Sequence, residues 1–380
     1  MAGQTAVSDA ARDGRIGVTI AEIVVRTVKI PLVTPYKVSN QVFDCFDPLV
    51  VEMRDADGRA GWGEALISAF YSNETPEGGW AFCNAMAERL VGLTGTAAKA
   101  LLRPAIHDNS HAASTLLTAI EMLERNPLLD APAPAAIRLL APVHSMDAGT
   151  VGREIDALIA EGFRTLKIKV GFDADRDLER LRAIQRVVGG RATLRLDANQ
   201  GFDRATACRF AAALDPTGIE LFEQPCHKDD WDANAAVATV STVPVMLDES
   251  IYGIAEIDRA ATLPGVGFVK VKLKKLGGLE ELERALQHIR AVGLEPVLGD
   301  GTATDISCWM EACVARSTIR NAGEMNGFLK LQRRLFETEL PFVDGAIRLP
   351  AGFGPRIDRA ALAAATETSR RHARVQSAAQ

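Results

Sequence analysis

The chain has 380 residues, of which 47% are hydrophobic and 24% are charged, so it can bury the core of one large domain or two smaller ones. Its formal net charge of −6 argues against nucleic acid or an anionic membrane surface as a partner. No apolar run approaches the roughly 18 residues of a membrane span, and the six cysteines lack the spacing of zinc ligands. We therefore expect a cytoplasmic protein with reduced cysteines.

The first part of the chain predicts a small α+β domain. Residues 1–15 lack an apolar core and are expected to be a flexible leader. A domain over residues 16–130 would then form a cap, followed by a proline-rich linker. Within the cap, β-branched runs, turns and helical spacing predict the following elements: strands over 16–31, 48–54 and 61–64, a loop over 32–41, and helices within 77–125.

Residues 135–340 alternate short apolar runs with helical runs. From the second run onward the strand centres are roughly 24 to 29 residues apart, which is one βα unit per step. An open doubly wound sheet would need a glycine-rich phosphate turn after its first strand, and the sequence has none there. We therefore predict an α/β protein built on a (β/α)8 TIM barrel, with residues 341–380 returning to the cap as a strand and ending in a helical tail. The predicted strand centres are Val143, Lys167, Leu196, Phe222, Met246, Val271, Val297 and Met325.

Three consecutive predicted strands end in an acid: Asp197, Glu223 and Asp248. Because functional residues lie at the carboxyl ends of barrel strands, these carboxylates are expected to converge. One such acid alone would more often be a helix cap or a surface ion pair, but three in succession suit a hard divalent cation. Without His or Cys at these positions, Mg2+ is favoured over Zn2+, and Mn2+ could replace it.

Lysines lie on either side of these acids. Lys167 and Lys169 are two residues apart, so they share one face of the second strand, and Lys272 ends the sixth. Two solvated lysines on an edge strand would be the simpler interpretation of an isolated Lys-x-Lys. Set beside the acids, Lys169 and Lys272 can lie on opposite sides of the α-carbon of a metal-bound carboxylate and stabilise an enediolate. Lys169 is the predicted base, and Lys167 lowers its pKa or contacts a carboxylate.

Further residues are predicted to contact the substrate. Two tyrosines lie in cap loops expected to close over the barrel mouth, although packing between the domains is an equal alternative. The others follow the third, seventh and eighth barrel strands, and the acid on the eighth favours a substrate that carries an amino group. These residues are Tyr36, Tyr71, Asn199, Asp300, Thr302 and Glu324.

The barrel motifs resemble the enolase superfamily, in the muconate-lactonizing subgroup of the mandelate racemase/muconate lactonizing enzyme family, over about residues 20–355. This resemblance implies metal ligands at the three acids, acid/base roles for Lys169 and Lys272, and a homo-oligomer. Two segments depart from the family pattern: residues 299–305 lack its Gly-x-Met-x-Glu, and Glu324-Met-Asn-Gly replaces the Asp-x-Asp of dipeptide epimerases. The motifs are Lys167-Ile-Lys169, Asp197-Ala-Asn199, Glu223-Gln-Pro225, Asp248-Glu-Ser250 and Lys272 to Gly278, with Gly61-Trp-Gly-Glu64 in the cap.

The predicted activity is Mg2+-dependent abstraction of the α-proton of a small carboxylate substrate. Racemisation or epimerisation of an amino-acid derivative and cycloisomerisation, both isomerase reactions, are the favoured outcomes. The alternative on the same scaffold is β-elimination by a dehydratase or synthase, a carbon–oxygen lyase. Two other classes stay open: a Schiff-base aldolase, which needs one lysine and no metal, and a barrel that binds without catalysis.

Overall fold

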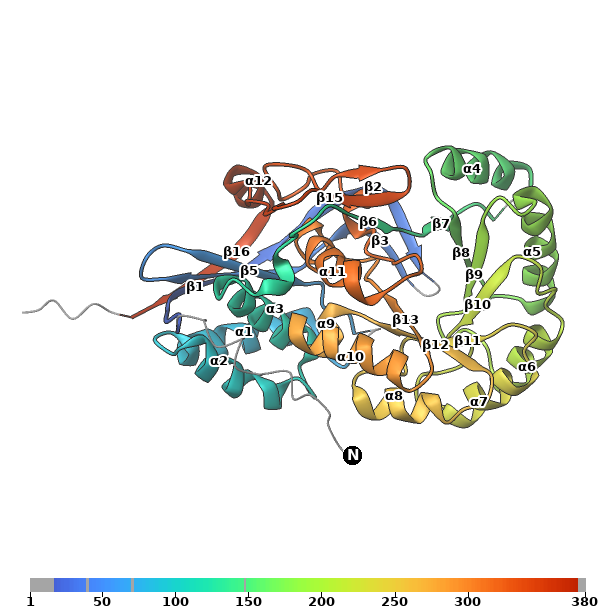
Figure 1. The fold of residues 1–380 in the computed structure, drawn as a ribbon, viewed down its shortest axis with the longest axis horizontal. Coiled ribbons are helices and arrows are strands. Elements are labelled where there is room, and N and C mark those ends of the chain that lie inside the picture. Colours follow the sequence, from blue (N-terminus) through green and yellow to red (C-terminus); the bar gives the residue numbers. More distant parts are fainter. Residues whose placement is uncertain (1–16, 39–40, 70–71, 147, 375–380) are drawn as a thin grey trace, which may run out of the picture.

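The structure is a computed structural model that describes residues 17–38, 41–69, 72–146 and 148–374. Figure 1 shows an antiparallel sheet with helices on one side of the molecule and a parallel sheet ringed by helices on the other. Within the described ranges no helix is both long and apolar enough to cross a bilayer.

The antiparallel sheet has the strand order β16-β1-β4-β5. Its helix α3 packs on β5, where Gly61 and Gly63 lie so close to the α3 backbone that a Cβ at either position would overlap it. This contact explains the Gly-x-Gly spacing of the cap motif. The strands are β1 (Ile20–Val28), β4 (Leu49–Asp55), β5 (Ala60–Ala65) and β16 (Thr366–Ala373), and the helices are α1 (Pro76–Leu90), α2 (Gly95–Leu102) and α3 (Ser110–Leu123).

The loop predicted over residues 32–41 is wrong, because β2 (Ile30–Val38) and β3 (Gln41–Phe46) form a separate two-stranded hairpin. The prolines and polar residues of β2 led to the prediction of a loop. Pro31 and Pro35 are tolerated because, among the described residues, β2 pairs with one strand, β3, and otherwise makes only an isolated bridge between Leu32 and Leu331. The register of the β2–β3 pair shifts between Pro31 and Tyr36.

The parallel sheet follows the predicted barrel order, β13-β12-β11-β10-β9-β8-β7. The predicted eighth strand is not a regular strand. Instead, the backbone N–H of Glu324 donates to Leu298 O at 2.9 Å and that of Leu140 donates to Gly323 O at 2.9 Å, so this short segment joins the two edges of the sheet. The strands are β7 (Ala141–Val143), β8 (Thr165–Lys169), β9 (Thr193–Asp197), β10 (Ile219–Glu223), β11 (Val245–Leu247), β12 (Val266–Val271) and β13 (Glu295–Leu298).

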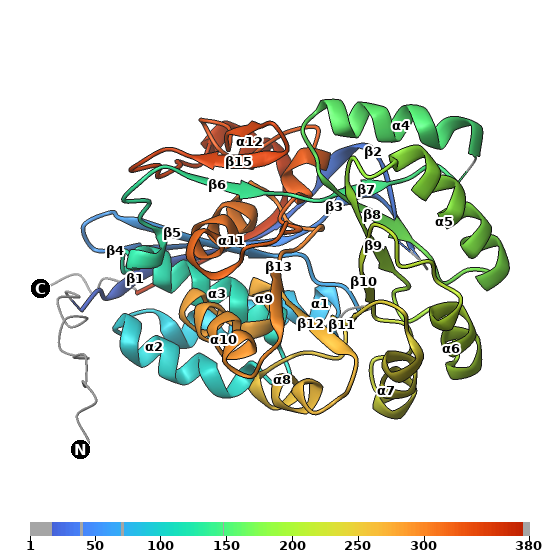
Figure 2. The same ribbon diagram turned by 45° about the vertical axis from the view of Figure 1, so that its right-hand side comes forward.

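Helices cover the outside of the parallel strands. In Figures 1 and 2, α4 to α8 form an arc around the sheet, and α10 and α11 lie between the sheet and the cap. Asp173 and Asp230 cap α5 and α7 by accepting hydrogen bonds from the first turn of each helix. The helices are α4 (Ala148–Ala160), α5 (Ala174–Val188), α6 (Arg204–Ala212), α7 (Trp231–Val240), α8 (Ile254–Ala261), α9 (Leu273–Leu276), α10 (Leu279–Ala291) and α11 (Asp305–Thr318), with short 3-10 turns at Arg103–Ala105, Pro127–Leu129 and Gly327–Lys330.

The C-terminal segment differs from the prediction. Strand β15 (Ala346–Leu349) pairs with β14 (Phe342–Val343) on one side and with β6 (Ala135–Arg138) on the other, and the strand that reaches the cap sheet is β16. Within the described residues, the predicted helical tail is therefore wrong after the short α12 (Arg359–Ala365), where β16 follows. Because β16 is an edge strand, nearly all its side chains are exposed and it lacks apolar alternation.

Candidate active site

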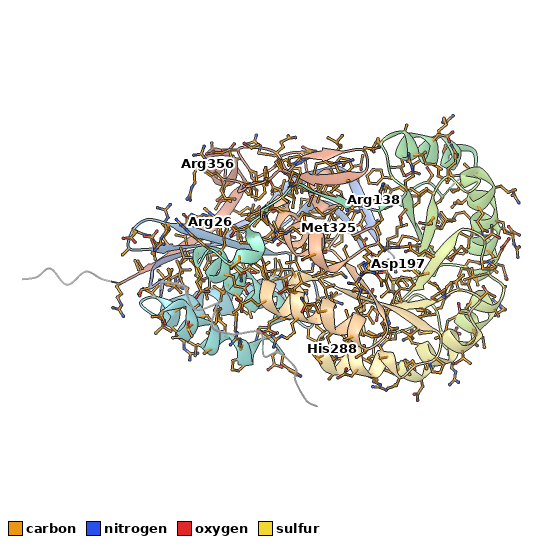
Figure 3. All side chains as sticks on the ribbon, viewed as in Figure 1. Arg26, Arg138, Asp197, His288, Met325 and Arg356 are labelled. Carbon is orange, nitrogen blue, oxygen red and sulfur yellow. The ribbon has the colours of Figure 1, made fainter. Side chains whose placement is uncertain are left out.

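The carboxyl ends of β8 to β12 bring the predicted acids and lysines together inside the barrel. Apolar neighbours on β8, such as Leu166 and Ile168, are fully buried on its other face. In Figure 3, Asp197 lies among the barrel strands, whereas His288 lies on the outer helix α10. The predicted residues gathered here are Lys167, Lys169, Asp197, Glu223, Asp248 and Lys272.

Lys167 is buried among three carboxylates. Its ammonium lies 2.9 Å from Asp197 Oδ2, 2.9 Å from Glu223 Oε2 and 2.9 Å from Glu324 Oε2. Burial alone would lower the pKa of Lys167, but the three acids outweigh it and hold this pKa well above its ordinary value. Lys167 therefore stays charged and organises the carboxylates.

Lys270 is a member of the site that sequence reasoning missed. Its ammonium lies 3.0 Å from Glu223 Oε1 and 3.4 Å from Asp248 Oδ2, and it also contacts Glu324. Glu223 and Glu324 raise the pKa of Lys270 against the effect of burial. The sequence contains a pattern that could have identified Lys270. Lys270-Val-Lys272, at the end of β12, repeats the Lys-x-Lys spacing of β8, and this spacing places Lys270 and Lys272 on one face of the strand.

Nearer the carboxyl ends of the strands, each predicted acid/base lysine is bound to a different acid. Lys169 Nζ lies 2.6 Å from Asp197 Oδ2 and contacts Asn199 Oδ1. Lys272 Nζ lies 2.9 Å and 2.7 Å from the two carboxylate oxygens of Asp248. Burial would lower the pKa of Lys272, but Asp248 outweighs it and this pKa is raised. Both lysines line one cavity of about 20 Å3, so the site is nearly filled by its own side chains.

Lys275 gives Asp248 a third ammonium partner, beside Lys270 and Lys272. Its fully buried Nζ donates to Asp248 O at 2.7 Å and to Asp248 Oδ1 at 2.9 Å. Burial lowers the pKa of Lys275 to about 8, against the opposing charge of Asp248. Burial would raise the pKa of Asp248, but Lys272 and Lys275 hold it well below its ordinary value.

Five of the six predicted substrate contacts line the same cavity, and Tyr71 lies outside the described residues. Two acids among the five are already bound by lysines. Glu324 accepts hydrogen bonds from Lys167 and Lys270, and Asp300 lies 2.5 Å from the ammonium of Lys274. Glu324 is therefore paired with two lysines, and its predicted preference for a substrate amine stays a prediction. The five residues are Tyr36, Asn199, Asp300, Thr302 and Glu324, and their roles in binding stay predictions.

Lys330 lies behind one wall of this cavity. Its Nζ donates to Gly301 O at 2.8 Å and to Asn326 Oδ1 at 2.7 Å, and it lies 4.5 Å from the centre of the Tyr36 ring. Burial lowers the pKa of Lys330 to about 8, with Glu324 opposing this shift. No sequence pattern singles out Lys330, because it lies in a 3-10 turn and not on a barrel strand.

The donor chemistry of the site fits a hard divalent cation. Among the residues that the structure describes, no group of three His, Cys, Asp or Glu side chains is already placed to hold a metal ion. The reason is that the ammonium groups of Lys167 and Lys270 lie between the carboxylates. Because each ammonium contacts oxygens of at least two of the three predicted ligands, these oxygens already converge on shared points, and all of them are carboxylate oxygens.

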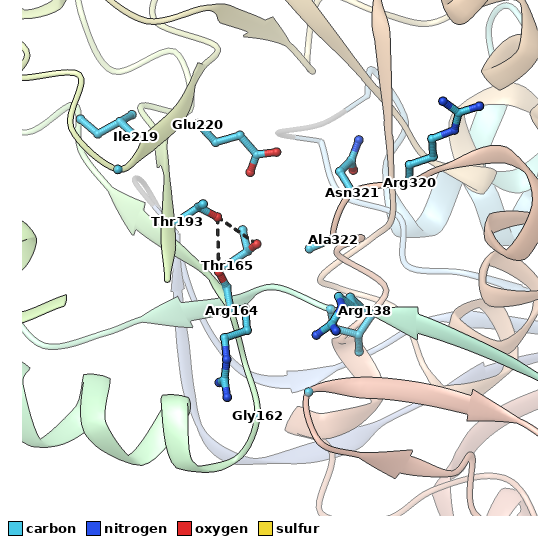
Figure 4. A pocket seen from close by; sticks show the side chains of 13 residues that line it. Arg138, Gly162, Arg164, Thr165, Thr193, Ile219, Glu220, Arg320, Asn321 and Ala322 are labelled. Carbon is cyan, nitrogen blue, oxygen red and sulfur yellow. Dashed lines mark hydrogen bonds between the residues drawn. The ribbon is translucent and has the colours of Figure 1, made fainter. Parts of the chain in front are cut away.

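A larger cavity of about 450 Å3 lies at the amino-terminal ends of the strands, near the start of β8 and β9 (Figure 4). Figure 4 shows the Thr193 hydroxyl bonded to the Thr165 hydroxyl, with the guanidinium groups of Arg164 and Arg320 pointing away from this pair. Glu220 is the acid that lines this cavity, and its carboxylate lies 2.8 Å from the guanidinium of Arg195. No lysine among the described residues lines this cavity, and the predicted pair Lys169 and Lys272 lines the smaller cavity at the other end of the barrel.

Known proteins resemble this chain over most of its length. The chain is 30% identical to an L-Lys-D/L-Arg epimerase of Methylococcus capsulatus, over 87% of this chain and 96% of that protein. It is 29% identical to an o-succinylbenzoate synthase of Geobacillus kaustophilus, over 71% of this chain and 74% of that protein. The structure matches that of a muconate lactonizing enzyme from Pseudomonas fluorescens with a TM-score of 0.85 at 24% identity, covering 93% of this chain and all of that one.

A family profile extends over the barrel. Residues 150–361 match the profile described as "Enolase C-terminal domain-like", which is more than half of the chain. The matched range contains Lys167, Lys169, the three acids and Lys272. The chain is therefore an enzyme of the enolase superfamily, in its mandelate racemase and muconate lactonizing enzyme family.

Proposed function

We propose that this enzyme removes the α-proton of a small carboxylate substrate and returns a proton through the lysine on the opposite side of the cavity. The observation that carries this proposal is the placement of Lys169 and Lys272 around one cavity, each bound to a different predicted metal ligand. Lys272, whose pKa Asp248 raises, suits the role of proton donor. Lys169, whose ammonium shares Asp197 with that of Lys167, takes the role of the base.

Family membership implies a divalent metal, and we propose Mg2+, or Mn2+ in its place, held by Asp197, Glu223 and Asp248. When bound, the ion supplies electrostatic stabilisation of a substrate carboxylate that gains negative charge. Lys167 and Lys270 hold the three carboxylates close together. Tyr36 and Thr302 border the cavity and would help to exclude water from it.

The product of the reaction follows from the fate of the proton. Return by Lys272 to the opposite face gives racemisation or epimerisation, and internal ring opening or closure gives cycloisomerisation. These outcomes suit the epimerase relative and the muconate lactonizing structure. β-Elimination is the second candidate, since a relative is an o-succinylbenzoate synthase. Location in the cytoplasm and assembly into a homo-oligomer stay predictions.

Exchange of the substrate α-proton for deuterium tests the proposal. The enzyme is incubated with candidate acids in D2O and Mg2+, and exchange is followed by NMR. Lys169→Ala and Lys272→Ala are each expected to lower exchange of one enantiomer at least 100-fold. EDTA should abolish exchange, and Mg2+ should restore it. Activity that survives EDTA, together with trapping of a lysine adduct by borohydride, would instead support a Schiff-base aldolase.

A further inference from the structure

The carbonyl of Lys169 lies beyond the end of a strand pair. Strand β7 ends at Val143, which pairs with Ile168, so Lys169 is one residue past the last pair of the β7–β8 ladder. A backbone carbonyl that is shielded from water and lacks a partner costs about as much free energy as a lost hydrogen bond. Here the guanidinium of Arg180, on α5, donates a hydrogen bond to Lys169 O. A side chain therefore replaces the missing strand at the residue predicted to act as the base.

The same guanidinium also binds the loop that follows β7. Its Nη1 lies 3.0 Å from Met146 Sδ and donates to Ser145 O at the longer distance of 3.5 Å. Its Nη2 is the group that donates to Lys169 O. The two arms of Arg180 thus join the end of β8 to the loop after β7.

This loop is itself held from two sides. The backbone N–H groups of His144 and Ser145 donate at 2.7 Å and 2.8 Å to the carboxylate of Glu154 on α4. The ring of His144 meets the Tyr36 ring of β2 edge to face, with the ring centres 6.1 Å apart. The loop is therefore a fixed support against which Arg180 can hold Lys169.

Arg180 makes these contacts without an acid partner. Within the part of the chain that the structure describes, no carboxylate lies within ion-pair distance of its guanidinium, and its buried Nε has no hydrogen-bond partner. A half-buried cation that binds only neutral acceptors is costly, because it has given up water without gaining a counter-charge. The fork of a guanidinium, however, reaches two separate acceptors at once, which a shorter neutral side chain does not.

The peptide group that Arg180 binds is also held at its other end. The carbonyl of Lys169 and the N–H of Val170 belong to one trans peptide group, so they point in opposite directions. This N–H donates to Asp197 O at 2.9 Å. Arg180 and the backbone of Asp197 therefore fix the peptide group from which the Lys169 side chain extends toward the cavity.

We propose that Arg180 is a positioning residue for proton transfer at Lys169, and that it acts through the Lys169 carbonyl and not by contact with the substrate. This inference rests on the proposed function, in which Lys169 and Lys272 serve opposite faces of the α-carbon. The carbonyl of Lys272 has a different partner, the backbone N–H of Lys275 at 3.1 Å. Loss of Arg180 should therefore impair one lysine of the pair and spare the other.

Comparison of the two enantiomers of a substrate tests the inference. Exchange of the α-proton in D2O with Mg2+ is measured by NMR for each enantiomer, and Lys169→Ala identifies the enantiomer that depends on Lys169. Arg180→Met should lower exchange of that enantiomer at least about tenfold, because a shift of about 1 Å in a reacting group can cost about 100-fold. Exchange of the other enantiomer should change less than about threefold. Arg180→Lys, which keeps the charge but not the fork, should restore part of the loss.

A second measurement needs no turnover. Hydrogen–deuterium exchange of backbone amides, followed by mass spectrometry, should be faster over residues 165–172 in Arg180→Met and unchanged over residues 266–272. The matched control is Arg182→Met, which removes an exposed arginine from the same helix and should alter neither measurement.

The inference is overturned if Arg180→Met leaves amide exchange over residues 165–172 as in wild type, or if it changes α-proton exchange of both enantiomers by the same factor. If wild-type enzyme exchanges the α-proton of no acid, the proposed function alone is contradicted. The amide measurement would then still decide whether Arg180 holds the backbone of Lys169 in place.

Discussion

Lys167 and Lys169 belong to one Lys-x-Lys pair, yet their surroundings give them different tasks. Lys167 is nearly inaccessible and lies between three carboxylates, whereas Lys169 is 13% exposed in its side chain and contacts one. A lysine shared by three acids is held in place by all of them. A lysine with one acid partner at the cavity surface is freer to exchange a proton.

The variants Lys167→Met and Lys169→Met should separate these tasks. Loss of Lys167 removes an ammonium shared by three buried carboxylates, which then keep only Lys169 and Lys270 as partners, so the free energy of unfolding should fall by up to about 3 to 5 kcal/mol. Lys169→Met should cost much less stability, because Asp197 retains Lys167, but should lower α-proton exchange at least 100-fold. Urea denaturation and deuterium exchange measure the two effects. Equal losses of stability in both variants would contradict this division.

The acids of the site could be predicted from the sequence because each ends an apolar run, a local pattern. The lysine partners could not all be predicted in this way. Lys274 and Lys275 are buried because α9 begins directly after β12, and a run of lysines does not reveal which of its members face inward. The position of Lys330 beside the site depends on its contacts with Gly301 and Tyr36, which are distant from it in sequence.

At the scale of elements, the Gly61-Trp-Gly-Glu64 segment fixes β5 against α3. A methyl group at Gly63 would overlap the Thr115 carbonyl of α3, which is backbone and cannot move aside without shifting the helix. Gly63→Ala should therefore lower the free energy of unfolding by about 1 to 3 kcal/mol or more, as overpacking does. Gly17→Ala is the control, because nothing lies within 4 Å of its added Cβ. Chemical denaturation compares them, and equal midpoints would contradict the packing argument.

Glu64, the last residue of that segment, ties β5 to the start of α11. One oxygen accepts hydrogen bonds from the backbone N–H groups of Thr304 at 2.7 Å and Ser307 at 3.1 Å. Its other oxygen, Oε2, is buried without a hydrogen-bond partner. Burial therefore raises the pKa of Glu64 to about 7, although the two hydrogen bonds oppose this shift.

This raised pKa predicts a pH-dependent stability. Between the unfolded pKa near 4.5 and the folded pKa near 7, the folded chain binds more protons, so wild-type stability from this group falls as pH rises, by at most about 3 kcal/mol. Glu64→Gln keeps an acceptor for both N–H groups and cannot ionise. Its stability relative to wild type should therefore increase from pH 5 to pH 8, measured by denaturant midpoints. A constant difference across this range would show that Glu64 ionises normally.

Elements were predictable where periodicity is strong. Residues 174–188 form helix α5, with Asp173 as its cap and Gly189 in the left-handed conformation at its end, as sequence signals of helix ends suggest. Hairpin β2–β3 escaped prediction because its prolines suggest a loop, and the tolerance of an edge strand for proline appears only once its neighbours are known. Closure of the barrel by Gly323 to Met325 uses hydrogen bonds from both edges and has no local pattern.

At the scale of the whole molecule, the two ends of the described chain meet in one sheet. Strand β16 pairs with β1 along most of its length, so residues far apart in sequence complete the cap. His372 is the buried residue of β16, and its ring nitrogen lies 2.8 Å from Asn84 Oδ1 on α1. Polar composition alone could not reveal this pairing, since an edge strand needs few apolar side chains.

Truncation after Ala365 should therefore affect the molecule well beyond its terminus. It removes β16, leaves without partners the backbone groups of β1 that face β16, and removes the contact of His372 with Asn84. The shortened chain should unfold at a lower denaturant concentration and should associate as its concentration rises, because an exposed strand edge pairs with other chains. Light scattering and urea denaturation measure these effects, and truncation after Arg374, which keeps β16, is the matched control. If both truncated chains unfold at the same midpoint and scatter like the full-length protein, β16 does not stabilise the cap.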